Sequence, residues 1–458
     1  MKQTSFVPRR TRSGISPGGV GLLSLVLILA GMTVTIATGK SPQSSHSIPR
    51  NMTKPSDQIA TTNSAPTEAQ SGFDGAPNDM VDATVHQADQ MVFEEVEDTS
   101  GGLGPVYNSE SCVSCHKSPM VGGSSQITEL RAGIVSSTGA FTNPTVVVAD
   151  GTVKILNRSL INDRATCPSG DYPTGSVQEH VPDNANVRAL RASLNTLGDG
   201  YIEAIADRTI VQLAISQCQS THGQICGQAI SVPLSEAAGQ TRIARFGWKD
   251  QQASLLSFSA DAYLNEMGVT SSLQPNDTTT VCKTTKDPED HDDADGMEDI
   301  DHFTRFMRAS KAPGRDENLA NTADAQIGAQ IFDRIGCDTC HVSSITTAPA
   351  GSVINGGAYV VPDALGNKII HPYSDFLLHN VGTGDGILQN GPPQTALKLR
   401  TPPLWGLRLH GRLMHDELSM TITDAIQRHA GEANGVVRNF RSLSAQDRGR
   451  LLKFLNSL

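Results

Sequence analysis

The sequence of 458 residues predicts a mainly α-helical fold of two domains with β-hairpin insertions. Two segments, 81–96 and 322–335, carry apolar residues at helical spacing, and each is followed by a glycine-containing break and a C-x-x-C-H motif. Between them, two β-branched runs flank Asp150-Gly151, a dipeptide that favours a hairpin turn. The chain therefore contains one helical unit twice and a β-rich insertion in its first half.

The two C-x-x-C-H motifs predict two covalently bound haem c groups. In such a motif the thiols add to the vinyl groups of the porphyrin, and the histidine becomes the proximal ligand of the iron. A zinc site would need four ligands per metal, usually from paired C-x-x-C units, whereas here each cysteine pair has its own histidine. We therefore expect two cytochrome c-type haem domains, each attached through one motif: Cys112, Cys115 and His116, and Cys337, Cys340 and His341.

Residues 1–40 have the pattern of an export signal. Basic residues precede an uncharged, largely apolar stretch from Ser13 to Gly39. A stretch of this length could also cross a bilayer once, so an uncleaved N-terminal membrane anchor stays open. Because haem is attached to this motif on the exported side, we expect a periplasmic protein, either free or held to the inner membrane.

The cysteines outside the motifs are candidates for disulfides, since an exported protein meets an oxidising compartment. They are Cys167, Cys218, Cys226 and Cys282, which allow three pairings. Pairing of Cys218 with Cys226 is favoured because "CQSTHGQIC" closes a short polar loop. Four free thiols are the alternative.

The net charge of −11 indicates an acidic surface. Residues 1–40 carry five basic and no acidic residues, so the rest of the chain is more acidic still. This balance argues against nucleic acid as a partner. It suits a basic redox partner, and we expect a small cytochrome c or copper protein as the electron donor.

Composition divides the chain after the signal. Residues 41–80 are rich in Ser, Thr, Pro and Asn and predict a disordered linker. We expect an N-terminal haem domain over 81–320, with the inserted β-rich segment, and a C-terminal haem domain over 321–458. The acidic "DDADG" at 292–296 lacks the spacing of an EF-hand, so a solvated loop is favoured over a calcium site.

Several longer phrases resemble one protein family. They are "GLGPVYNSESCVSCH", "RFGWK", "HPYSDFLLH" and "LRTPPLWGL", followed by "MHD" and "HAGEA". Together they resemble the di-haem oxidoreductase and peroxidase family, which is related to bacterial di-haem cytochrome c peroxidases and to the maturation enzyme of methylamine dehydrogenase. The resemblance covers residues 83–458. It implies two haem groups and an oxidoreductase activity.

The resemblance also implies a sixth ligand for the C-terminal haem. The ligand position falls on His429, where the peroxidases carry methionine and the maturation enzyme tyrosine. His415, Met414 and His379 remain alternatives. Glu417 stands where the family has glycine, which puts the local turn geometry in question.

The N-terminal haem has no comparable ligand, because no histidine occurs between His116 and His180. We expect an open iron there, which is the state that hydrogen peroxide needs. The resemblance assigns the general acid-base group to Glu203. The expected function is peroxide reduction at the N-terminal haem with electrons entering through the C-terminal haem. Oxidation of a protein or organic substrate, and electron transfer alone, are the alternatives.

Overall fold

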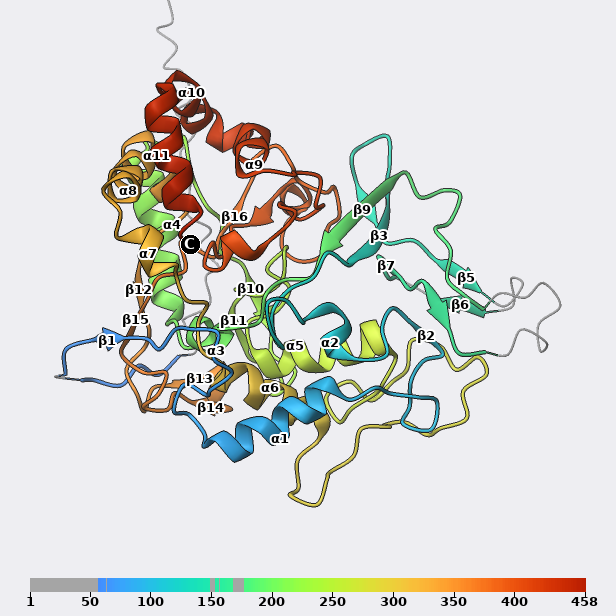
Figure 1. Ribbon diagram of the computed structural model, residues 1–458. Coiled ribbons are helices and arrows are strands. Elements are labelled where there is room, and N and C mark those ends of the chain that lie inside the picture. The colour runs from blue at the N-terminus through green and yellow to red at the C-terminus, as the bar shows by residue number, and fades with distance from the viewer. Residues whose placement is uncertain (1–56, 63, 149–152, 156, 168–176) are drawn as a thin grey trace, which may run out of the picture. The chain divides into compact units, whose positions relative to one another are not determined.

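A computed structural model describes residues 57–458 except 63, 149–152, 156 and 168–176 (Figure 1). The expected signal or anchor over 1–40, and residues 41–56 of the expected linker, lie outside the described residues. The described chain is mostly helical with several small sheets, as the sequence predicts. Among the described residues, no helix has the length and apolar character needed to cross a membrane.

The first haem motif follows a helical pair. Helix α1 (Ala83–Glu94) begins at Asp82, whose side chain accepts hydrogen bonds from two backbone amides of the first turn. It packs on α6 (Asp299–Ala309), where the Phe93 ring lies 5.0 Å from that of Phe306. The motif itself forms the single turn α2 (Cys112–Cys115), beside this pair.

The second motif is built on α8 (Ala323–Ile335) and α11 (Ala445–Leu455), which lie side by side (Figure 1). Helix α8 ends at Gly336, whose φ of 94° is a left-handed conformation that favours glycine. Between the helices Gly328 allows a close approach, because a Cβ atom there would overlap the carbonyl of Arg450. The helix and glycine break predicted before this motif are confirmed.

This close approach gives a stability prediction. Gly328→Ala is expected to lower the free energy of unfolding by about 1–3 kcal/mol, because the added methyl group meets a backbone carbonyl that cannot move freely. The matched control is Gly449→Ala on the partner helix, where an added methyl group would meet no atom within 4 Å. It is expected to stabilise by about 0.5–1 kcal/mol. Thermal unfolding measures both, and equal effects would contradict this packing.

The predicted β-rich insertion is present. Strand β3 (Thr128–Val135) pairs antiparallel with β9 (Val187–Ala192), β7 (Leu160–Ile161) and β4 (Phe141–Thr142). The expected hairpin around Asp150-Gly151 is confirmed by the pairing of β5 (Val146–Val148) with β6 (Val153–Ile155), although the turn itself lies outside the described residues. Strand β2 (Val106–Tyr107), just before the first motif, pairs with β8 (Arg164–Ala165).

The remaining elements are mostly short. The helices are α3 (Asp199–Glu203), α4 (Asp207–Ser220), α5 (Leu255–Ala262), the π-helical turn η2 (Tyr263–Met267), α7 (Glu317–Ala320), α9 (Ile422–Arg428) and α10 (Asn434–Ser442). The strands form the pairs β10 (Ser231–Pro233) with β11 (Thr241–Ile243), β13 (Val353–Ile354) with β14 (Tyr359–Val360), and β16 (Leu378–His379) with β17 (Leu399–Arg400).

The second part of the expected disordered linker pairs with other segments of the chain. Strand β1 (Thr67–Glu68) pairs parallel with β15 (Lys368–Ile370), which also pairs with β12 (Ile345–Thr346). Further along, the Asn78 side chain donates to the carbonyl of Arg308. The described part of 57–80 is therefore anchored to distant segments, which its polar composition does not reveal.

Two disulfides account for the cysteines outside the motifs. Cys218 and Cys226 are joined, which confirms the favoured pairing. Cys167 is joined to Cys282, so the insertion is tied to the polar loop that follows η2. The four motif cysteines remain free thiols, as covalent haem attachment requires.

Candidate di-haem site

Both C-x-x-C-H motifs open onto one continuous cavity of about 930 Å³. Its lining includes both cysteines and the histidine of each motif, and most of the other lining surface is apolar. Single ligand pockets commonly measure roughly 300–1,000 Å³, so this cavity lies at the upper end of that range. Its size, apolar character and free thiols fit covalently held porphyrins.

The two motif histidines are held in the same way. The Nδ1 atom of His116 lies 3.2 Å from the carbonyl oxygen of Gly123, and that of His341 lies 3.0 Å from the carbonyl oxygen of Tyr373. A proton on Nδ1 satisfies each carbonyl and leaves Nε2 with a free lone pair. Each ring is thus held by a backbone hydrogen bond in a way that suits the predicted role of proximal ligand.

Their charge state agrees with this role. Burial lowers the pKa of His116, and burial together with the nearby His429 lowers the pKa of His341 to about 4. Both imidazoles are therefore neutral near pH 7, which is the form that binds metal.

His429 lines the cavity at the end of α9. Its Nδ1 atom lies 2.8 Å from the carbonyl oxygen of Ala425, so its Nε2 atom can act as a ligand in the same way as in the motif histidines. Burial lowers its pKa. His429 therefore stays the predicted sixth ligand, with its Nε2 atom available.

The alternative ligands differ in their surroundings. His415 and Met414 line the cavity, and the His415 ring lies 6.0 Å from that of Trp248. His379 also reaches the cavity, but both of its ring nitrogens lie 2.9 Å from a carboxylate oxygen, those of Asp375 and Glu432. With both nitrogens bonded, His379 has no lone pair for iron. Glu417, where the family has glycine, takes the left-handed φ of 54° that glycine favours.

Helices α5 and α9 both line the cavity. Each begins with a hydroxyl cap: the Ser254 side chain accepts from the amide of Ser257, and that of Thr421 accepts from the amide of Asp424. When the two caps are aligned, Trp248 in the loop before α5 corresponds to His415 in the loop before α9.

The same alignment compares the residues that face the cavity. Ala262 takes the place that His429 has in the second half, and Glu266 takes the place of Ala433. All four residues line the cavity. At the aligned positions, the second half therefore has a histidine where the first half has a methyl group, and a methyl group where the first half has a carboxyl group. Ala262 and Glu266 were not predicted from the sequence, although alignment of the two helix caps could have found them.

Glu266 is a buried carboxyl group whose pKa depends on Glu129. Its Oε2 atom accepts a hydrogen bond of 2.7 Å from the Asn108 side chain. Glu129 is ion-paired with Arg131 at 2.7 Å, which helps to keep its pKa low. Burial and the Glu129 charge raise the pKa of Glu266 to about 8. One proton is therefore held beside the first motif at neutral pH.

Glu203 is the residue for which the resemblance implied the general acid-base role. It is fully buried and is absent from the described residues that line the cavity. Its carboxylate accepts from Arg308 at 2.6 Å and from the amide of Leu255 and the side chain of Asn355. Although burial opposes ionisation, Arg308 lowers its pKa. These bonds occupy Glu203 in a buried ion pair, so the acid-base role does not fit it.

The acidic loop after η2 offers no clear calcium site. Asp277, Asp287 and Glu289 come together there, but the Lys283 ammonium lies between them, 2.8 Å from Asp277. A lysine already supplies the positive charge that a cation would bring. In the "DDADG" segment, the backbone amide of Asp293 instead closes a turn by bonding to the carbonyl oxygen of Met297.

Comparison with known proteins identifies the family. Residues 140–458 match the family model described as "Di-haem oxidoreductase, putative peroxidase". The chain therefore belongs to this family of di-haem oxidoreductases. The sequence matches none of the curated proteins.

Two solved structures have low similarity to this chain. One is hydrazine synthase of Kuenenia stuttgartiensis, at 14% identity and a TM-score of 0.37, covering 94% of this chain and 100% of that one. The other is a MauG-like protein associated with microbial copper homeostasis, at 16% identity and a TM-score of 0.31, covering 87% of this chain and 94% of that one.

Proposed function

We propose that this di-haem oxidoreductase reduces hydrogen peroxide at its N-terminal haem with electrons that enter through its C-terminal haem. The observation that carries the proposal is the difference between Ala262 and His429, which line the cavity at the same offset from the caps of α5 and α9. His429 would offer an imidazole nitrogen as a second ligand to the C-terminal haem, which suits electron transfer. Ala262 would offer no ligand atom to the N-terminal haem, which suits binding of a small oxygen ligand.

The residues that would hold the two groups are already in place. Cys112 and Cys115 would form the thioethers of the first haem, and Cys337 and Cys340 those of the second. When bound, haem c supplies an iron that exchanges single electrons and, where a coordination position is free, binds peroxide. Because residues of both motifs line one cavity, the two groups would be held in a shared space, as electron transfer between them would need.

Glu266 is the residue we assign to proton transfer. Reduction of one hydrogen peroxide to two waters consumes two electrons and two protons. In its ionised form, the Glu266 carboxylate could take a proton from one peroxide oxygen and return it to the other, which would leave as water. Burial and the charge of Glu129, which is held as an anion by Arg131, raise the pKa of Glu266 to about 8 and so favour uptake of that proton. The cysteines and histidines of the two motifs then need not transfer protons during peroxide reduction.

Steady-state turnover tests the proposal. The holoprotein with a reduced small cytochrome c as donor is expected to consume peroxide and oxidise two equivalents of donor per peroxide. Negligible turnover with the donor, together with peroxide-dependent oxidation of a protein or organic substrate, would favour the other enzymatic function. If neither reaction occurs, electron transfer would be the remaining function and the proposal would be refuted.

The donor and the compartment are part of the same proposal. An acidic chain with covalent haem and disulfides suits the periplasm and a basic cytochrome or copper protein. Opposite charges speed encounter and are screened by salt. The turnover rate at limiting donor is therefore expected to fall as ionic strength rises. A rate that is independent of salt would contradict this electrostatic steering.

A further inference from the structure

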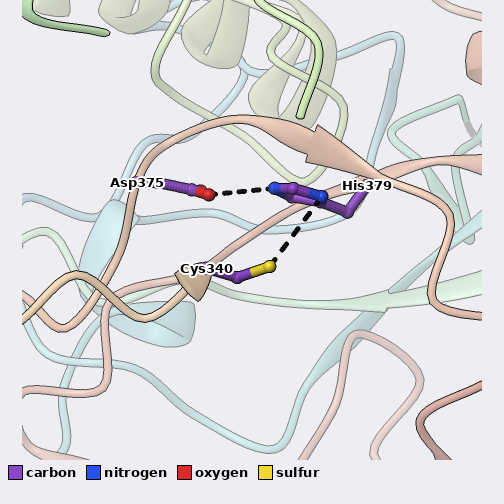
Figure 2. A group of neighbouring side chains, drawn as sticks. All are labelled: Cys340, Asp375 and His379. Carbon is purple, nitrogen blue, oxygen red and sulfur yellow. Dashed lines mark hydrogen bonds and ion pairs between the residues drawn. The ribbon is translucent and has the colours of Figure 1, made fainter. Parts of the chain in front are cut away.

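His379 lies in a buried carboxylate environment beside the second motif. Figure 2 shows its imidazole between Asp375 and Cys340. The Nε2 atom lies 2.9 Å from Asp375 Oδ2, and the Nδ1 atom lies 2.9 Å from Glu432 Oε2. His379 is 2% exposed and Asp375 is fully buried.

This geometry fixes the charge of His379. Carboxylate oxygens accept hydrogen bonds, and a neutral imidazole has only one N–H group to donate. Since both ring nitrogens face carboxylates, both carry a proton and the ring is an imidazolium. Burial alone lowers the pKa of His379, but the Asp375 charge raises it well above its usual value.

Both carboxylates are anchored by further donors, so the cluster is rigid. Gln217 donates from its side chain to Asp375. Glu432 accepts from the backbone amides of Asn380 at 2.9 Å and Cys226 at 3.1 Å. The cluster therefore holds one cation between two anions, at fixed positions.

The cluster touches the haem attachment point. The His379 Nδ1 atom lies 3.9 Å from the Cys340 sulfur, and His379 lines the cavity. Cys340, Asp375 and His379 have the donor types of a metal site. However, Cys340 belongs to the haem motif and both His379 nitrogens are bonded, so the cluster acts through its charge.

We infer that His379 is a fixed cation that raises the reduction potential of the C-terminal haem. The inference rests on the proposed function, because it requires haem c on Cys337 and Cys340. Reduction adds an electron to the haem, and a buried positive charge nearby stabilises the reduced state in a medium of low dielectric constant. Glu432, an anion in the same cluster, has the opposite effect. Together they set the potential at which this haem accepts electrons.

Two charge-changing variants of the full-length holoprotein test the inference by spectroelectrochemical titration. His379→Gln removes the cation and is expected to lower the potential of the low-spin C-terminal haem. Glu432→Gln removes an anion and is expected to raise it. The matched control is His371→Gln, which breaks an exposed pair with Glu68 and is expected to leave the potential unchanged.

The signs of the two shifts in reduction potential test the inference. Unchanged potentials, or shifts in the same direction, would overturn the inference, because a merely structural disturbance has no reason to follow charge. If His379→Gln does not fold, the sign of the Glu432→Gln shift decides alone. A wild-type protein without haem c on the second motif, shown by mass spectrometry, would overturn the proposed function instead.

Discussion

Ala262→His is expected to convert the N-terminal haem from high-spin to low-spin and to abolish its reaction with peroxide. The substitution places an imidazole at the same offset from the cap of α5 that His429 has from the cap of α9. The new side chain would occupy the free coordination position, so peroxide could no longer bind. Absorption and electron paramagnetic resonance spectra report the spin state, and stopped-flow mixing with peroxide reports the reaction.

The control for this variant is Ala262→Leu, which fills similar space without a ligand atom. It is expected to keep the N-terminal haem high-spin. The converse variant, His429→Ala, is expected to make the C-terminal haem high-spin and to slow electron entry. An Ala262→His protein that still reacts with peroxide at the wild-type rate would show that Ala262 does not face the iron.

Glu266→Gln is expected to slow the reaction with peroxide by about 10²-fold or more, the usual contribution of a general acid-base group. The wild-type rate should rise as the pH increases through about 8, because only the ionised carboxylate can accept a proton and the pKa of Glu266 is about 8. Glutamine does not titrate, so the variant should lack this rise. Stopped-flow measurements from pH 6 to 9 compare the two profiles.

Glu203→Gln tests whether proton transfer belongs to Glu266 or to Glu203, the residue that sequence resemblance predicted. Because Arg308 would lose the buried charge it is paired with, this variant is expected to lose about 3 kcal/mol or more of stability. Its pH profile should keep the rise near pH 8. A wild-type profile in Glu266→Gln, combined with a lost rise in Glu203→Gln, would return the proton-transfer role to Glu203.

Local features of the sequence predicted much of the fold. The helices before each motif, the glycine that ends α8 and the β5–β6 hairpin depend on neighbouring residues, and all are present. The short disulfide loop followed from spacing in the same way. In contrast, residues 57–80 are held by pairing of β1 with β15, a contact between segments far apart in the chain.

The residues of the candidate site also divide into those that local sequence predicts and those that depend on contacts between distant segments. The motif residues are contiguous, so their pattern was sufficient to find them. Glu203 was placed by resemblance of its segment, but resemblance does not give the direction of a side chain, and here that side chain meets Arg308 on α6. Glu266 depends on η2 and β3 meeting in the cavity wall, so its pairing with Glu129 required the structure.

The central claim is that the two haem sites differ in their sixth ligand. Low-temperature electron paramagnetic resonance of the oxidised wild-type holoprotein tests it most directly. The account predicts one high-spin and one low-spin haem in equal amounts, with the high-spin signal assigned to the N-terminal site by its loss in Ala262→His. Two low-spin haems, in both the oxidised and the half-reduced protein, would contradict it.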